Sequence, residues 1–450
     1  MTPGSGRAVA RRELRATFVL ALPLVLGQVA AMFMGVVDSI LAGRHGLHTL
    51  AAVTVGSSVW SVALLACIGI LLAIPPSVAQ LTGAGRRHEV AAVFHQALWI
   101  ALAMGALLAV AVWHSPRLLE AIGIVPEIRP LAAGFLRAIA FGAPALALFF
   151  CLRYLAEGLA HTTPGMFAGF GGLLALVPLG FALMFGAGPV PELGATGLGI
   201  ATAVVTWGQA LGLGWYLWRS PAYADLGLFA RFERPHWPSI RALLALGLPM
   251  GITIFMEGSL FVATALLIGR LGAIDVAAHQ IALNVASVCF MLPLGIAMAT
   301  TVRVGQAAGA GDPTGVRRAA WAGFGLGAVT QAAAAALLLF GGPWIARVYT
   351  DEAAVAALAV LLMRYAAVFQ LPDGIQVLSN GVLRGLKDTR VPMLVTVFAY
   401  WGVGLPLGAW FGLHLQGRAP GLWVGLIIGL SVAALGLAWR VWARVRRSQG

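Results

Sequence analysis

The chain has 450 residues, of which 60% are hydrophobic and only 10% are charged, and its formal net charge is +13. This composition excludes a soluble globular protein and indicates a chain that resides in a lipid bilayer. The positive charge does not indicate nucleic-acid binding, because the sequence has no basic soluble domain that could carry such a patch. The three cysteines all lie in apolar runs, which predicts buried hydrophobic side chains without a disulfide or metal framework.

Apolar stretches of 18 or more residues recur along the whole sequence, and each is long enough to cross about 30 Å of hydrocarbon. Their length and uniform hydrophobicity predict helices, because barrel strands are shorter and alternate in polarity. The first stretch has no small-residue cleavage site, so we expect it to be retained as a helix. The twelve predicted transmembrane helices span residues 16–41, 50–76, 91–113, 131–155, 166–186, 195–217, 242–268, 276–300, 319–340, 354–381, 391–412 and 420–440.

Basic residues gather at alternate ends of these helices. If both termini lie inside, nineteen of the 29 Lys and Arg residues lie on the inner side and six on the outer side. This asymmetry follows the positive-inside rule and predicts that both termini are cytoplasmic. The same asymmetry accounts for the positive net charge.

The second half of the chain repeats the first. Residues 21–85 align without a gap on residues 247–311, and 20 of the 65 pairs are identical, where chance would give about six in this composition. Pro23 aligns with Pro249 in this register, and Arg137 aligns with Arg364 at a shift one residue longer. Two like halves in a membrane chain are typical of an alternating-access carrier.

The repeat predicts an all-α polytopic membrane protein with two homologous lobes of six transmembrane helices. Because six is an even number, both lobes insert in the same orientation, related by a pseudo-two-fold axis along the membrane normal. The expected lobes are residues 1–217 and 242–450, the second with a basic cytoplasmic tail, and residues 218–241 form a cytoplasmic linker loop. Pro23 and Pro249 predict a kink in the first helix of each lobe, which either changes during transport or is a static packing feature.

Three of the sixteen acidic residues fall within predicted transmembrane helices. They are Asp38, Glu257 and Asp373, whereas the other thirteen lie at or near helix ends or in loops, where we expect water to solvate them. An ionisable group inside the bilayer costs at least ~2.5 kcal/mol, which makes these three residues functional candidates.

Glu257 and Asp373 each belong to a polar helix face in the second lobe. Thr253, Phe261 and Thr264 share the face of Glu257. Gln376 and Asn380 continue the stripe of Asp373. We expect the two stripes to face one cavity. Two carboxylates there would repel each other, so either one holds a proton or the two share a Na⁺ ion, a hard cation that prefers oxygen ligands. The alternative is a purely structural polar network.

Asp38 has no acidic counterpart, because it aligns with Thr264 in the second half. It is predicted to be a second proton site, a contact for a cationic substrate, or a buried acid that stabilises helix packing. Met34, one turn earlier, either contributes to an adaptable apolar pocket or fills the core. Further intramembrane amides either line the transport path or hydrogen-bond neighbouring helices, and these are Gln28, Gln280, Asn284, Gln376 and Asn380.

With these residues the chain resembles the multidrug and toxic-compound extrusion (MATE) transporters, in particular the bacterial NorM-like branch. The resemblance covers essentially the whole chain and is carried by residues 23–28, 35–38, 277–284, 373–377 and 383–389. It implies efflux of bulky, often cationic compounds driven by Na⁺ or H⁺. It also implies cation-coupling carboxylates at Glu257 and Asp373 and an important acid at Asp38.

The sequence departs from this family's pattern in two places. Members often carry asparagines in the fifth helix beside the first-lobe acid, and residues 176–180 contain none. Many members have a tyrosine four residues before the second-lobe aspartate, where this chain has Phe369. The aromatic ring is kept there, but the hydroxyl group is lost.

Together these observations predict a secondary active multidrug antiporter, with no enzymatic activity, no nucleic-acid partner and no obligate protein partner. We expect no cofactor other than the coupling ion, and we expect the protein to lie in the inner (plasma) membrane. One alternative is a flippase for a lipid-linked sugar, which would place cationic residues in its cavity. Another is a channel or sensor, which would not need duplicated lobes with kinked first helices.

Overall fold

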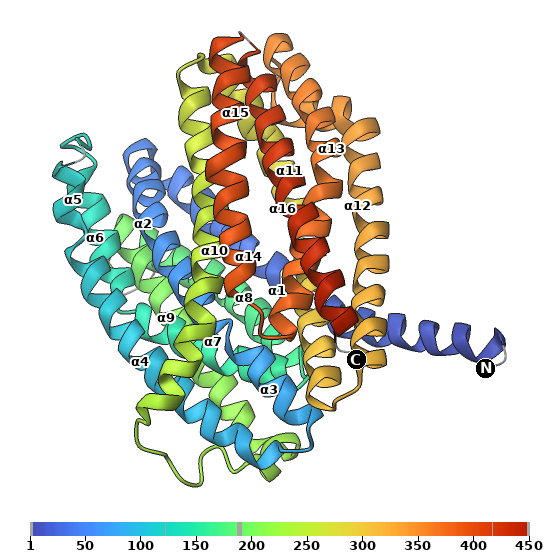
Figure 1. The fold of residues 1–450 in the computed structure, drawn as a ribbon. Coiled ribbons are helices and arrows are strands. Elements are labelled where there is room, and N and C mark those ends of the chain that lie inside the picture. The colour runs from blue at the N-terminus through green and yellow to red at the C-terminus, as the bar shows by residue number, and fades with distance from the viewer. Residues whose placement is uncertain (1–2, 122, 187–190, 416, 448–450) are drawn as a thin grey trace. The chain divides into compact units, whose positions relative to one another are not determined.

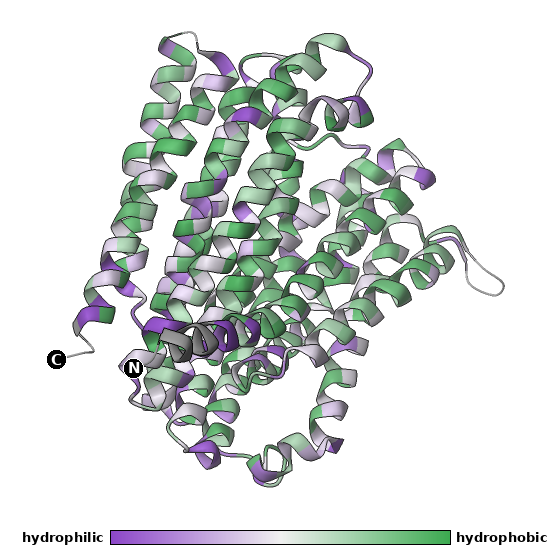
Figure 2. Ribbon diagram, turned by 90° about the vertical axis from the view of Figure 1, so that its right-hand side faces the viewer, coloured by the Kyte–Doolittle hydropathy of each residue, from purple (hydrophilic) through white to green (hydrophobic). Residues whose placement is uncertain are grey.

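The computed structural model describes residues 3–121, 123–186, 191–415 and 417–447. Within these residues the chain is helical and has no strand. Eleven helices in this part of the chain are long and apolar enough to cross a membrane, and a bent pair of helices makes a twelfth when it is counted as one span. Figure 2 shows hydrophobic residues along the helix bodies and hydrophilic residues mainly at helix ends and in loops. The predicted all-α polytopic fold is confirmed.

The first half contains α1 (Pro3–His45), α2 (Leu47–Leu71), α3 (Ile74–Gly83), η1 (Arg87–Glu89), α4 (Val90–His114) and α5 (Pro116–Ala121). The fourth predicted span is broken into α6 (Arg129–Ala140) and α7 (Ala143–Gly158), which are bent by 45°. Pro144 lies in the first turn of α7, where its missing N–H is tolerated. Then α8 (Thr163–Phe185), α9 (Gly194–Arg219) and η2 (Pro221–Leu226) follow.

The second half contains α10 (Trp237–Gly269), α11 (Ala273–Gly309), α12 (Pro313–Tyr349) and α13 (Ala353–Gly385). The next span alternates between α-helical and π-helical turns, through α14 (Arg390–Val397), η3 (Phe398–Gly404), α15 (Leu405–Ala409) and η4 (Trp410–His414). The last helix is α16 (Arg418–Arg447). Helix α13 packs against α11, α12 and α16, so it is the central helix of this half (Figure 1).

The chain forms two compact units that divide inside the first helix of each half. One unit joins the residues up to Val25 to those from Ile252 onward, and the other is Leu26–Gly251. Both divisions lie two residues after the intrahelical prolines, Pro23 and Pro249. The units therefore differ from the lobes predicted at residues 217 and 242, because the start of each first helix packs with helices of the other half. Whether the prolines move during transport stays a prediction.

Glycines permit the close helix approaches next to these divisions. A Cβ atom on Gly69 of α2 would lie 2.3 Å from Cα of Gly251 on α10. A Cβ atom on Gly295 of α11 would lie 2.9 Å from the backbone nitrogen of Val25 on α1. In the repeat, Gly69 aligns with Gly295, and Val25 aligns with Gly251. In each compact unit, a glycine therefore permits two helix backbones to come into contact.

The linker between the halves is attached to the start of α4. Arg87 Nε donates to Asp225 Oδ2 at 2.8 Å, and this hydrogen bond holds the pKa of Asp225 below its ordinary value. Gln96 Nε2 donates to the Arg234 carbonyl oxygen at 3.1 Å, and Gln96 Oε1 accepts from His236 N at 2.8 Å. These contacts belong to one compact unit, so the linker is part of its packed structure.

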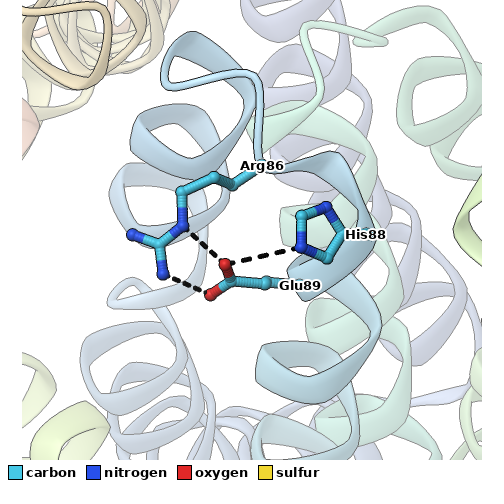
Figure 3. A network of polar contacts seen from close by, with 3 residues as sticks. All are labelled: Arg86, His88 and Glu89. Carbon is cyan, nitrogen blue, oxygen red and sulfur yellow. Dashed lines mark hydrogen bonds and ion pairs between the residues drawn. The ribbon is translucent and has the colours of Figure 1, made fainter.

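A small exposed network lies just before α4 (Figure 3). Arg86 donates to both carboxylate oxygens of Glu89, at 2.5 and 2.6 Å, and His88 Nε2 lies 3.6 Å from Glu89 Oε1. Exposed ion pairs of this kind contribute little to stability. We interpret the network as a solvated loop end and not as a ligand site.

Three acids at helix ends are buried, although the sequence analysis expected water to solvate them. They are Glu157, Asp275 and Asp388. Each pairs with arginine: Glu157 with Arg153 at 2.6 Å, Asp275 with Arg418, and Asp388 with both Arg440 and Arg444. The expectation of solvation is wrong for these acids, because neighbouring helices shield them and guanidinium groups replace the water.

The contact between α13 and α11 should depend on Gly381. A Cβ atom at this position would lie 2.6 Å from the Ala297 carbonyl oxygen, so Gly381→Ala forces two helix backbones apart. We expect a loss of about 1–3 kcal/mol in stability, measured as a lower thermal unfolding midpoint in detergent. Gly325→Ala in α12 is the matched control, because its Cβ would meet nothing closer than 3.9 Å. An equal midpoint for both variants would contradict this packing argument.

Candidate functional site

The structure brings Glu257 and Asp373 together in the second half of the chain. Glu257 lies on α10 and is partly buried, whereas Asp373 lies on α13 and is only 2% exposed. The two carboxyl groups are close enough to interact electrostatically. Pro372 precedes Asp373 inside α13 and removes one backbone hydrogen bond next to the acid. The arrangement places two carboxyl groups near a proline inside a membrane-spanning helix.

Polar side chains extend from Asp373 along α13. Gln370, Gln376, Ser379 and Asn380 are all buried. The side chain of Gln376 lies near the Glu257 carboxyl group. Neither of its amide atoms has a hydrogen-bond partner of good geometry. Buried polar atoms are nearly always satisfied, so such atoms indicate room for a water molecule or an ion.

Unpartnered polar atoms concentrate around this stripe. Among the described residues, fifteen buried side-chain nitrogen or oxygen atoms have no partner, and nine of them belong to α12, α13 and the α14–η3 segment. These nine atoms belong to Gln331, Gln370, Asp373, Gln376, Ser379, Thr396 and Tyr400. All nine are oxygen or amide nitrogen atoms, and their oxygen atoms can bind water, a proton or a hard cation.

Tyr400 on η3 was missed by the sequence analysis. Its side chain is 0% exposed, its hydroxyl has no partner, and it interacts electrostatically with both Glu257 and Asp373. A local signal existed, because Thr396 and Tyr400 are hydroxyl residues one helical turn apart within an apolar span. Periodicity could have identified this pair, but not its proximity to the two acids.

One basic residue, Arg384, also acts on Glu257. Arg384 lies three turns beyond Asp373 on α13 and interacts electrostatically with Glu257. Along the sequence, the basic residues nearest to Glu257 are Arg241 and Arg270. The fold supplies Arg384 from a different helix, which offsets part of the negative charge.

Aromatic rings line one side of the carboxyl pair. The Phe261 and Phe369 rings meet at 6.1 Å in a T-shaped arrangement, and Phe369 meets Trp423 at 6.2 Å. Trp423 Nε1 donates to His279 Nδ1 at 3.2 Å. Phe261 follows Glu257 by one turn and Phe369 precedes Asp373 by one turn, so this wall accompanies the acids on both helices.

The remaining polar candidates of the second half lie on α11. Gln280 is exposed and its Nε2 donates to Asn284 Oδ1 at 3.1 Å, while Asn284 is partly buried. The described contacts do not connect this amide pair to Glu257 or Asp373. No group of three or more His, Cys, Asp or Glu side chains in the described residues could hold a metal ion, so any cation here would need other oxygen ligands.

In the first half, Asp38 is partly buried on α1 and its Oδ1 atom is buried without a partner. It forms no ion pair with any described residue. Met34, one turn earlier, packs against the cluster that contains Leu176 and Ala201. The stretch of α8 beside it is apolar, as the sequence of residues 176–180 predicts, so Asp38 has no amide neighbour there.

Gln28, the other polar candidate of the first half, lies beside a buried ion pair. Arg153 Nη2 is 3.4 Å from Gln28 Oε1, and Arg153 Nε is 2.6 Å from Glu157 Oε1. Glu157 Oε2 has no partner. The structure thus places Gln28 at an Arg–Glu pair on α7 and shows no contact between Gln28 and Asp38.

An apolar groove lies between α8 and α9, and its lining residue Val205 belongs to the cluster against which Met34 packs. It is lined by side chains such as Phe167 and Tyr216 and by glycines that include Gly171 and Gly208. It contains none of the ionisable residues described above.

Comparisons with known proteins point to one family. Residues 23–182 and residues 249–410 match the MatE family model, so both halves are covered. The chain is 54% identical over 434 residues to "Probable multidrug resistance protein NorM" of Xanthomonas campestris pv. campestris, covering 96% of this chain and 95% of that protein. It is 42% identical over 442 residues to "Multidrug resistance protein PmpM" of Pseudomonas aeruginosa, covering 97% and 93%.

Solved structures share the fold. The eukaryotic MATE transporter AtDTX14 superposes with a TM-score of 0.88 at 19% identity, over 98% of this chain and 99% of that one. A multidrug resistance MATE family transporter of the MOP superfamily, in an outward-facing conformation, gives a TM-score of 0.88 at 19% identity, over 97% of both chains. The resemblance to NorM-like MATE transporters found in the sequence is confirmed.

The Arg153–Glu157 pair should be a stability element. Arg153→Met leaves the Glu157 carboxylate buried and unpaired, which typically costs about 3–5 kcal/mol. We expect a marked fall in the thermal unfolding midpoint, and we expect the double variant Arg153→Met/Glu157→Leu to recover most of it. A double variant as unstable as the single one would show that the guanidinium contributes through packing and not by neutralising Glu157.

Proposed function

The chain belongs to the MatE family, and from this membership together with the paired carboxyl groups on α10 and α13 we propose that it is a multidrug efflux antiporter. It exports bulky, often cationic organic compounds in exchange for Na⁺ or H⁺. Transport follows alternating access, and the coupling ion is the only cofactor that the cycle needs. The membrane is the inner membrane, with both termini in the cytoplasm.

The observation that carries this proposal is the Glu257–Asp373 pair surrounded by unpartnered polar atoms. Ionisable groups in a membrane-spanning helix are costly and are kept where they move ions or protons. Two neighbouring carboxylates repel each other, and uptake of one cation or proton relieves that repulsion. The pair therefore behaves as a cation receptor whose free energy depends strongly on occupancy.

Occupancy of such a site can drive exchange only if it favours one conformation. An ion that bound both conformations equally would shift nothing, however tightly it bound. The carboxyl pair spans two helices, so its separation changes whenever α10 and α13 move. This makes its ion affinity sensitive to conformation, as coupled exchange requires.

The first test replaces each acid of the pair. In vesicles with an imposed Na⁺ or H⁺ gradient, Glu257→Gln and Asp373→Asn should each abolish gradient-driven movement of the cationic dye ethidium. The physical reason is that a neutral amide cannot bind and release the coupling charge. The dye fluorescence is followed with each gradient separately, which also identifies the ion.

Asp351→Asn is the matched control, because it makes the same chemical change at an exposed acid outside the membrane spans. This variant should keep the unmodified rate. Folding of all variants is checked by size-exclusion chromatography. Dye export that survives replacement of both Glu257 and Asp373 would overturn the proposal, and so would a protein that responds to neither gradient.

Asp38 is proposed to contact cationic substrates. Its buried, unpartnered oxygen and the apolar surroundings suit an organic cation better than a small hydrated ion. Asp38→Asn should raise the half-saturating concentration of ethidium about tenfold, equivalent to ~1.4 kcal/mol, and leave that of a neutral substrate unchanged. Equal effects on cationic and neutral substrates would assign Asp38 to helix packing or to ion binding instead.

A further inference from the structure

The span that contains Tyr400 departs from regular α-helix in the segment around Tyr400. Residues 398–404 form the π-helical element η3 between α14 and α15. A π-turn adds a residue to the helix and so changes which side chains point inward, and such turns are frequent at functional sites. The backbone irregularity here coincides with the one tyrosine of this span, so it decides where the Tyr400 hydroxyl lies.

The Tyr400 ring is held firmly while its hydroxyl is not. The side chain belongs to a core cluster that also contains Leu260, Phe369 and Trp423. The hydroxyl oxygen is buried and has no hydrogen-bond partner. A phenylalanine would fill the same space without burying an unpaired hydroxyl, which is an unfavourable arrangement. The core packing alone therefore does not account for a tyrosine at this position.

The contacts of η3 bring the segment that contains Tyr400 close to the parts of α10 and α13 that carry the two acids. Trp401 Nε1 donates to the carbonyl oxygen of Met256 at 3.4 Å, and Met256 directly precedes Glu257 on α10. Tyr400 also packs in one core cluster with Leu260, which lies one turn after Glu257, and with Phe369, which lies one turn before Asp373. Thr396, one turn before Tyr400, has a second buried hydroxyl without a partner.

We infer that the Tyr400 hydroxyl is part of the coupling-ion site and binds the ion together with the carboxyl groups of Glu257 and Asp373. This inference rests on the proposed antiport. A phenol oxygen is a neutral ligand for a hard cation and a hydrogen-bond donor to a carboxylate that has lost its proton. Phe369, the aromatic residue one turn from Asp373, has no hydroxyl group. A phenol oxygen for this site must therefore come from another element, and Tyr400 on η3 supplies it.

The test is Tyr400→Phe, which removes one oxygen atom and keeps the ring. Purified full-length protein is reconstituted into vesicles, and ethidium transport is measured while Na⁺ is varied at fixed pH and, separately, while the proton gradient is varied without Na⁺. The half-maximal concentration of the driving ion should rise about tenfold, as for loss of a hydrogen bond to a charged group. The maximal rate should stay close to that of the unmodified protein, and the thermal unfolding midpoint should be equal to or higher than its midpoint, because the variant buries no unpaired hydroxyl.

Tyr349→Phe is the matched control, because Tyr349 is 50% exposed at the end of α12 and should be silent. An unchanged half-maximal ion concentration in Tyr400→Phe would overturn the inference. A lower midpoint together with an unchanged ion dependence would overturn it too, since Tyr400 would then serve packing alone.

The same experiment separates this inference from the proposed antiport. The unmodified protein and Asp373→Asn are measured in parallel. If the unmodified protein moves dye with one gradient and Asp373→Asn does not, the antiport holds and the Tyr400→Phe result judges the inference alone. If the unmodified protein responds to neither gradient, the antiport fails, and the inference fails with it.

Discussion

The absence of water inside the bilayer is the constraint on which the rest of this structure depends. A polar group in a spanning helix must find its partner within the protein, because lipid offers none. The described helices meet this requirement mostly by local means: Thr202, Thr206 and Thr300 each donate to the carbonyl four residues earlier. Buried acids at helix ends are paired with arginines. Against this background, the unpartnered atoms around Asp373 are an exception that needs a separate explanation.

The two halves share their helix arrangement but differ in their buried polar residues. Gly69 and Gly295 occupy equivalent places and permit equivalent helix approaches, and the family model matches both halves. At the equivalent polar positions, however, Arg153 and Glu157 of the first half align with Asn380 and Arg384 of the second. The first half therefore pairs Glu157 with an arginine of the same helix, whereas the equivalent positions of α13 hold no acid. The two halves thus share a frame, and the Glu257–Asp373 pair belongs to only one of them.

Most of the fold could be predicted from the sequence because its determinants are local and repetitive. Apolar length identified the spans, including the bent fourth one, and the repeat identified the two halves. The polar stripes also placed Glu257 and Asp373 on helix faces that the structure brings together. The contributions of Tyr400 and Arg384 could not be predicted, because each reaches Glu257 from another element, and no periodicity encodes which helices are neighbours. The burial of Asp275 and Asp388 was missed for the same reason.

The chemistry around the carboxyl pair explains why it would select cations and still release them. Arg384 offsets part of the charge on Glu257, but Asp373 faces Glu257 with no comparable help, so the site favours positive over negative ligands. A fully neutralised pair, like Arg153–Glu157, would have no affinity left for an ion. An isolated pair would bind its ion too tightly to let it go, since charges interact strongly in a medium of low dielectric constant. A partly compensated pair lies between these limits, which is where a carrier that must bind and release in every cycle has to operate.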